Sequence, residues 1–128
     1  MQYFLSKYYE GSFDEAVARV TELLAHQGFG ILTEIDVKAT FKSKLDLEFR
    51  PYKILGSCSP VLAREAIAAE PQIGALMPCN WTIQEDEEGR IEVSVMNPSM
   101  LTEITGNLAL QRVQGRVQSS INAVLDEL

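Results

Sequence analysis

The chain has 128 residues, is 46% hydrophobic and 23% charged, and carries a formal net charge of −7 from 11 Lys plus Arg against 18 Asp plus Glu. This is the composition of a folded globular protein, and its acidic balance argues against nucleic-acid or anionic-lipid binding, which need clustered positive charge. A chain of this length typically forms one domain, so we expect residues 1–128 to be a single unit.

The sequence also bears on the compartment. The first ten residues lack a basic start followed by an apolar run, and no apolar stretch approaches the ~20 residues of a transmembrane helix. Two cysteines, Cys58 and Cys79, are too few for a disulfide framework. We therefore expect a cytoplasmic protein with reduced thiols and no membrane partner.

The first half of the chain alternates strand and helix patterns. Residues 2–9 mix Tyr, Phe and Leu and predict a strand. Ser12-Phe13-Asp14-Glu15 is a capping box, which begins a helix that ends at Gly28. Residues 29–34 predict a second strand, and Asp36 is placed to cap a short helix after it.

The second half continues the alternation. Residues 52–57 predict a third strand, and Ser-Pro at the start of 59–69 predicts a capped helix. Residues 74–84 and 90–96 predict two strands joined by an acidic turn, and an apolar stripe over 107–128 predicts a final helix that covers the sheet. A dimer seam is the alternative role for that stripe.

These elements together favour an α+β fold. The strand-turn-strand pattern around the acidic turn requires antiparallel pairing, which argues against a doubly wound parallel sheet. We predict a single two-layer domain with a mixed or antiparallel sheet of about five strands and helices packed on it. The order of the strands does not follow from the patterns.

The two cysteines lie in distinctive surroundings. Cys58 directly precedes the predicted helix start at Ser59-Pro60, where free N–H groups and the helix dipole favour a thiolate. Cys79 follows Met77-Pro78, and a proline inside a predicted strand indicates an edge or a bulge. Together the thiols would suit a redox pair or a soft-metal site, whereas the alternative is two small buried residues that pack well. With two Cys and one His, a structural zinc site is disfavoured.

Charged residues offer a second, weaker hypothesis. Glu34 and Asp36 flank a strand-to-helix junction and could serve as an acid–base pair or a hard-metal contact. The alternative is a helix cap at Asp36 and an exposed residue at Glu34. Five of the basic residues fall within residues 38–53, which suits either a small anionic ligand or a solvated surface.

Three segments and two short motifs occur in a characteristic order. The segments are residues 31–40 (ILTEIDVKAT), 50–58 (RPYKILGSC) and 73–80 (IGALMPCN), and the motifs that follow are Asn97-Pro98 and Thr105-Gly106-Asn107. In this order they resemble the family catalogued as domain of unknown function 302. The resemblance covers nearly the whole chain and implies a small α+β domain that tends to form homodimers. It implies no reaction, substrate or cofactor.

The familiar segments contain most of the residues already singled out. The candidate ligand-binding residues are Cys58, Cys79, Glu34, Asp36, Tyr52 and Asn80, and the first two are the candidate metal ligands. We predict a cytoplasmic homodimer that acts as a thiol-based redox, soft-metal or small-ligand binding module. The alternative is a non-catalytic structural or protein-interaction module without a cofactor. A third hypothesis is an enzyme that uses Glu34 and Asp36 on a small anionic substrate.

Overall fold

Five strands form one sheet in the part of the chain that the structure describes, residues 2–128 of a computed structural model. Their order across the sheet is β1-β5-β4-β3-β2, and every neighbouring pair is antiparallel. The strands are β1 (Phe4–Tyr9), β2 (Gly30–Asp36), β3 (Tyr52–Cys58), β4 (Cys79–Glu85) and β5 (Ile91–Met96). The predicted α+β fold is confirmed, and the sheet is antiparallel throughout.

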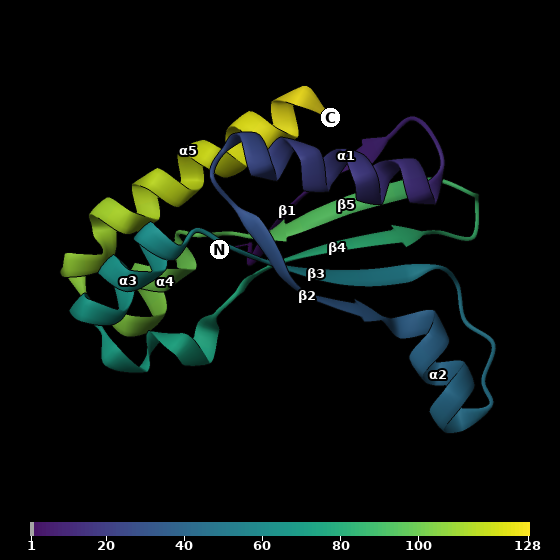
Figure 1. Cartoon of the computed structure of the whole chain (residues 1–128), viewed down its shortest axis with the longest axis horizontal. Helices are drawn as coiled ribbons and strands as arrows, with labels where there is room; N and C mark the ends of the chain where they lie inside the picture. Colours follow the sequence, from purple (N-terminus) through teal and green to yellow (C-terminus); the bar gives the residue numbers. More distant parts are fainter. Residues whose placement is uncertain (1) are drawn as a thin grey trace.

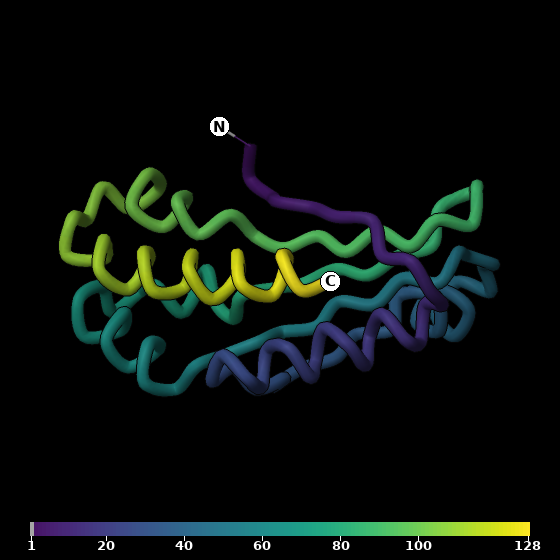
Figure 2. Tube along the Cα trace, turned by 90° about the horizontal axis from the view of Figure 1, so that it is seen from above, coloured from purple at the N-terminus to yellow at the C-terminus, as the bar shows by residue number. Residues whose placement is uncertain are grey.

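The helices surround this sheet unevenly. They are α1 (Phe13–His26), α2 (Val37–Leu45), α3 (Pro60–Ala69), α4 (Met100–Thr105) and α5 (Gln111–Glu127), with short 3₁₀ turns η1 (Pro71–Leu76) and η2 (Leu108–Leu110). Helices α1 and α5 lie over the same face of the sheet (Figures 1 and 2). Helix α2 projects at one end of the molecule, and α3 and α4 lie at the other end (Figure 1). The sheet therefore has one covered face and one face without a helix over its centre.

Local capping signals set the helix starts as predicted. The Ser12 Oγ accepts a hydrogen bond from the Glu15 N–H at 3.1 Å, and Glu15 Oε1 accepts one from the Ser12 N–H at 3.4 Å. The Asp36 carboxylate caps α2 by accepting from the Ala39 N–H at 2.9 Å. Gly28 has a φ of +81°, a left-handed conformation that glycine adopts without steric penalty, and it turns the chain from α1 into β2.

The core lies between the covered face and the two long helices. Helix α5 buries Val113, Val117, Ile121 and Val124, so its apolar stripe covers the sheet as predicted. From the sheet, the largest buried side chain is Trp81, whose indole N–H has no hydrogen-bond partner within residues 2–128. Because the chain has one tryptophan, its fluorescence can report on unfolding of this core.

The prediction of a strand over residues 74–84 is wrong at its start. Residues 71–76 form the 3₁₀ turn η1, and β4 begins at Cys79, just after a cis peptide bond between Met77 and Pro78. Pro78 lacks the N–H that a ladder needs, so it precedes the strand and does not bulge it. The irregularity in this sheet lies instead on β2, where the register shifts between Ile31 and Thr33.

Candidate functional site

The face of the sheet that α1 and α5 leave uncovered, here called the open face, is polar at its centre. Side chains alternate along β4, so Trp81 and Ile83 are buried toward the helices while Thr82 and Gln84 point away from them. Directly opposed residues of paired strands share a face. The open face therefore combines Phe4 from β1, Glu92, Ser94 and Met96 from β5, Asn80, Thr82 and Gln84 from β4, and Tyr52 from β3.

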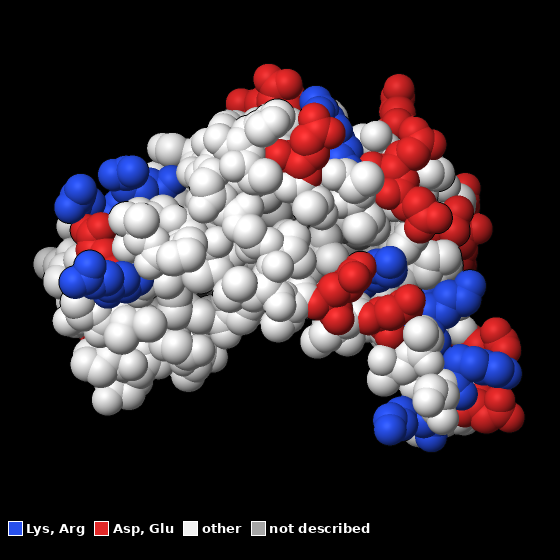
Figure 3. Space-filling view, viewed as in Figure 1, with Lys and Arg blue, Asp and Glu red and all other residues white. Residues whose placement is uncertain are grey.

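A hollow of about 420 Å³ lies on this face, and we call it the sheet-face hollow. Its lining residues are Tyr3, Phe4, Tyr52, Asn80, Thr82, Gln84, Glu92, Ser94, Val95, Met96 and Met100. The outline of the molecule is hollowed beneath the sheet, between α2 and the α3–α4 end (Figure 3). Aromatic rings, thioethers and hydrogen-bonding groups thus converge in a space of the size that binds small molecules.

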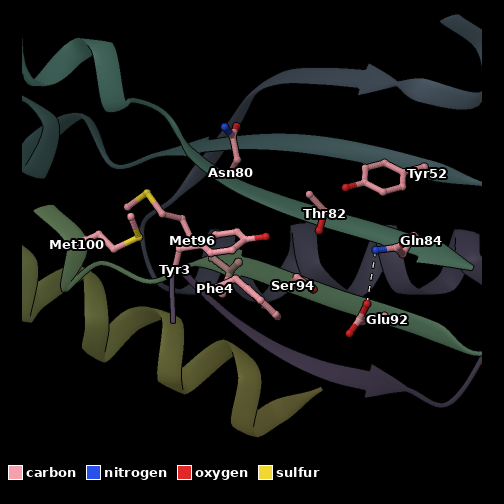
Figure 4. Close-up of a pocket in the computed structure, with 11 residues that line it drawn as sticks. Tyr3, Phe4, Tyr52, Asn80, Thr82, Gln84, Glu92, Ser94, Met96 and Met100 are labelled. Carbon is pink, nitrogen blue, oxygen red and sulfur yellow. Dashed lines mark hydrogen bonds between the residues drawn. The ribbon is translucent and has the colours of Figure 1, made fainter. Parts of the chain in front are cut away.

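Tyr3 reaches the hollow because the N-terminal segment is tied to the end of β5. The Asn97 N–H donates to the Tyr3 carbonyl at 2.8 Å, and Asn97 Nδ2 donates to the Gln2 carbonyl at 2.9 Å. The Tyr3 ring packs edge-on against Phe4, with 5.0 Å between the ring centroids. Figure 4 shows the Tyr3 and Tyr52 hydroxyl groups turned toward one another across the hollow.

A chain of polar contacts holds one end of the hollow. Arg50 Nε donates to Gln84 Oε1 at 3.0 Å, and Gln84 Nε2 lies 3.5 Å from Glu92 Oε1 (Figure 4). The Arg50 guanidinium also rests over the rings of Phe49 and Tyr52, 4.4 and 5.6 Å from their centroids. These contacts fix the Tyr52 ring and orient the Gln84 amide toward the Glu92 carboxylate.

The two cysteines line a second, smaller space of about 40 Å³, here called the cysteine cavity. Its walls are mostly apolar and include Cys58, Cys79, Met77, Pro78 and Met96. Burial, and to a lesser extent the neighbouring Cys58, raises the pKa of the Cys79 thiol from 9.0 to about 11. Cys79 is therefore a protonated thiol at neutral pH and a weak nucleophile there.

The residues around the cysteine cavity are firmly placed. Ser57, which is 1% exposed, donates through Oγ to the Cys79 carbonyl at 3.0 Å and so ties β3 to the first residue of β4. Ser59 caps α3 by accepting from the Leu62 N–H at 3.5 Å, which places Cys58 directly before the helix as predicted. The cavity and the sheet-face hollow share one wall, the side chain of Met96.

Glu34 and Asp36 line neither space. The Glu34 carboxylate lies 3.2 Å from Lys53 Nζ, and Asp36 is occupied as the α2 cap. Glu34 also pairs with Leu55, a buried residue of the covered face, so it lies on the opposite side of the sheet from the hollow. The structure thus separates the predicted site residues into three places: Tyr52 and Asn80 in the hollow, the cysteines in their cavity, and the two acids at the β2 edge.

Two of the five basic residues in the predicted segment, Lys42 and Lys53, are paired with acids. Lys42 Nζ, on α2, lies 2.9 Å from a carboxylate oxygen of Asp46 and from one of Glu48, two exposed acids that follow the helix. Lys53 pairs with Glu34. These two lysines are therefore engaged by acids of the chain itself.

Within residues 2–128, no three His, Cys, Asp or Glu side chains cluster so as to hold a metal ion, and no helix is long and apolar enough to cross a membrane. Sequence reasoning missed Tyr3, Thr82, Ser94 and Glu92 as members of a site. Alternation of polar and apolar residues over 80–85 and 91–96 was the available signal, since it marks one face of the hairpin as polar.

Comparison with known proteins gives a family and a fold. The family described as "Domain of unknown function DUF302" matches residues 5–128. Among solved structures, the crystal structure of an uncharacterized conserved protein DUF302 from Bacillus stearothermophilus has a TM-score of 0.90, 24% sequence identity, and 98% coverage of each chain. No curated protein matches the chain. At this identity the solved structure supports the fold and nothing about a ligand.

Proposed function

The chain belongs to the DUF302 family, and we propose that it is a binding module for a small organic ligand, which lies in the sheet-face hollow. One observation carries this proposal: a 420 Å³ space on an otherwise uncovered sheet face is walled by aromatic rings and by polar side chains from three strands. Such a mixture of apolar area and a few fixed polar groups is typical of ligand pockets. Tyr52 and Asn80, two of the predicted ligand-binding residues, are among its walls.

The physical argument is one of pre-organisation. Regular strands hold Asn80, Thr82 and Ser94, so their spacing does not change when a ligand enters. The Tyr52 ring is restrained by Arg50, which stacks over it. A ligand therefore meets groups whose conformational freedom is already reduced, and this limits the entropic cost of binding.

We expect 4-phenylbutan-1-ol, a ring with a hydroxyl tail, to bind in the sheet-face hollow with millimolar affinity. A contribution of about 0.3 kcal/mol for each heavy atom corresponds to roughly that affinity. Titration into isotope-labelled protein should shift the backbone amide resonances of Asn80, Thr82 and Ser94 in a saturable way. Thr82→Phe should abolish the shifts, because the added ring fills the hollow from β4.

Thr21→Phe is the matched control. It makes the same chemical change outside the hollow, because Thr21 lies on the exposed surface of α1. It should leave the titration unchanged. Shifts that do not saturate, or that persist in Thr82→Phe, would contradict the proposal. In that case the remaining interpretation is the structural or protein-interaction module.

A second candidate function is favoured by the cysteine cavity. We propose that Cys58 and Cys79 bind a soft monovalent metal, Cu(I), with a thioether from Met77. Both thiols and this thioether line one small space with mostly apolar walls. Thiolate and thioether sulfur are the ligands that Cu(I) prefers, and a space of about 40 Å³ suits an ion better than an organic molecule.

We expect the reduced protein to retain one Cu(I) per chain against the chromogenic chelator bathocuproine disulfonate. In Cys58→Ser and in Cys79→Ser the metal should pass to the chelator, because each variant lacks one of the two sulfur ligands, which release their protons to solvent when the metal binds. Met77→Leu should weaken retention, while Met100→Leu, which alters the hollow and not the cavity, should not. Complete transfer from the unaltered protein would refute the metal site. Formation of a Cys58–Cys79 disulfide with peroxide would then favour the redox alternative.

The homodimer implied by the family resemblance, the cytoplasmic location and the absence of a nucleic-acid partner stay predictions. The net charge of −7 remains the physical support for the last of them.

A further inference from the structure

The walls of the sheet-face hollow differ in chemistry from one end to the other. The end near α4 is apolar, with the Met96 and Met100 thioethers beside the Tyr3 ring (Figure 4). The opposite end holds the Glu92 carboxylate and the Gln84 amide (Figure 4). Met96 and Glu92 are four residues apart on β5, which is about 14 Å along a strand.

In the part of the chain that the structure describes, Glu92 is the one charged side chain that lines the hollow. Among residues 2–128, no Lys or Arg forms an ion pair with it, and its side-chain contact is the Gln84 amide at 3.5 Å. The nearby Arg90 is occupied, since its guanidinium pairs with Asp86 at 2.8 Å and Glu88 at 2.9 Å. The acidic end of the hollow therefore carries a partly buried carboxylate that forms no ion pair with a Lys or Arg among residues 2–128, and the Arg90 guanidinium rests instead over the ring of Tyr8, which lies opposite Glu92 on β1.

Arg50 is a second charged group near this end of the hollow, and its positive charge is opposite to that of Glu92. It is exposed, rests on the faces of Phe49 and Tyr52, and donates its Nε to Gln84, but it does not line the hollow. The charge of Arg50 is therefore screened by solvent. Its hydrogen bond to Gln84 Oε1 positions the side-chain amide that faces Glu92. Of the two charged groups, the Glu92 carboxylate lines the hollow and the Arg50 guanidinium does not.

We infer that the ligand of the sheet-face hollow is an organic ammonium ion that carries an aromatic ring, with the ammonium on Glu92 and the ring against Tyr3 and Met96. This inference rests on the proposed function and adds the chemical class of the ligand. The ammonium gains a charge-assisted hydrogen bond to the Glu92 carboxylate. The aromatic ring gains contact with the thioethers and with Phe4.

Three probes of matched shape and different charge test the inference: 4-phenylbutylamine, 4-phenylbutan-1-ol and 4-phenylbutyrate. Titrations followed by amide chemical shifts should show the amine binding about tenfold more tightly than the alcohol at low salt, and the carboxylate more weakly than both. The advantage of the amine should shrink as salt is added, because screening weakens the ion pair. This salt series uses the unaltered protein and does not depend on any variant folding.

Glu92→Gln keeps the shape of the side chain and removes its charge, so the amine should fall to the affinity of the alcohol. Glu127→Gln makes the same change on the exposed end of α5 and should have no effect. An amine advantage that survives Glu92→Gln would assign the preference to the overall charge of −7 and overturn the inference. Equal affinities, or tightest binding of the carboxylate with loss in Arg50→Gln, would overturn it as well. Those outcomes leave the hollow intact as a binding site, whereas failure of all three probes is failure of the proposed function itself.

Discussion

Gly56→Ala is expected to lower the free energy of unfolding by about 1–3 kcal/mol, the range for forcing an added methyl group into a packed site. Gly56 is buried in the middle of β3. A Cβ atom there would lie 2.6 Å from Cγ of Pro78 and closer still to Oγ1 of Thr33. Because the Pro78 ring is rigid, the methyl group can be accommodated only by moving β3 or the segment that leads into β4. Urea unfolding followed by Trp81 fluorescence measures the loss.

Gly30→Ala is the matched control on the neighbouring strand, where an added Cβ meets no atom of the described residues 2–128 within 4 Å. We expect it to change the free energy of unfolding by no more than about 0.5 kcal/mol. Adding Thr33→Ala to Gly56→Ala should recover part of the loss, because it removes one of the two close contacts and leaves Pro78. Equal stabilities of Gly56→Ala and Gly30→Ala would show that β3 and Pro78 are not packed as the structure has them.

The features that sequence reasoning predicted well are those encoded by neighbouring residues. Ser12 with Glu15, Asp36 with Ala39, and Ser59 with Leu62 are each three residues apart, so each cap can be recognised within one helical turn. The apolar stripe of α5 is local in the same sense, since its period alone indicates which face is buried.

The wrong start of β4 has a tertiary cause. Ile73 to Met77 forms an apolar run that favours a strand on composition. In the structure, residues 71–76 are a 3₁₀ turn that packs Ile73, 2% exposed, into the core, and Pro78 postpones strand pairing to Cys79. Whether such a run pairs with a strand or packs as a turn depends on neighbours supplied by α3 and α5, which no local pattern specifies.

The candidate site was only partly predictable for a similar reason. Asn80 and Tyr52 could be singled out from their segments, but their companions come from distant strands. Tyr3 reaches the hollow because Asn97 donates hydrogen bonds to the carbonyls of Tyr3 and Gln2. Glu92 reaches it because β5 pairs with β4. Long-range contacts of this kind determine that β1 pairs with β5. Local sequence patterns do not indicate which distant strands pair. The two cysteines likewise line one cavity because β3 pairs with β4, which places Ser57, the neighbour of Cys58, opposite Cys79.

Alkaline pH should remove stability that the buried Cys79 thiol contributes. Its folded pKa is about 11 and its ordinary value is 9.0, so folding disfavours the thiolate. The folded chain therefore holds the thiol proton more tightly than the unfolded chain does. The resulting contribution to the free energy of unfolding is fully present well below pH 9 and is lost as the pH rises through 11. Raising the pKa from 9.0 to about 11 corresponds to about 3 kcal/mol in full. Metal-free protein should lose about 2 kcal/mol of this between pH 9 and pH 11, and the remainder falls on either side of that window.

The comparison of the unaltered protein with Cys79→Ala isolates the effect, because tyrosines and lysines that also titrate at high pH are shared by both proteins. The difference in their free energies of unfolding, measured by urea denaturation with far-ultraviolet circular dichroism, should shrink by about 2 kcal/mol between pH 9 and pH 11. In a Cys58→Ala background most of the shrinkage should remain, since burial raises the pKa of Cys79 more than Cys58 does. A difference that stays constant with pH would mean that the Cys79 thiol ionises as readily in the folded chain as in the unfolded one, and the cysteine cavity would then be open to water.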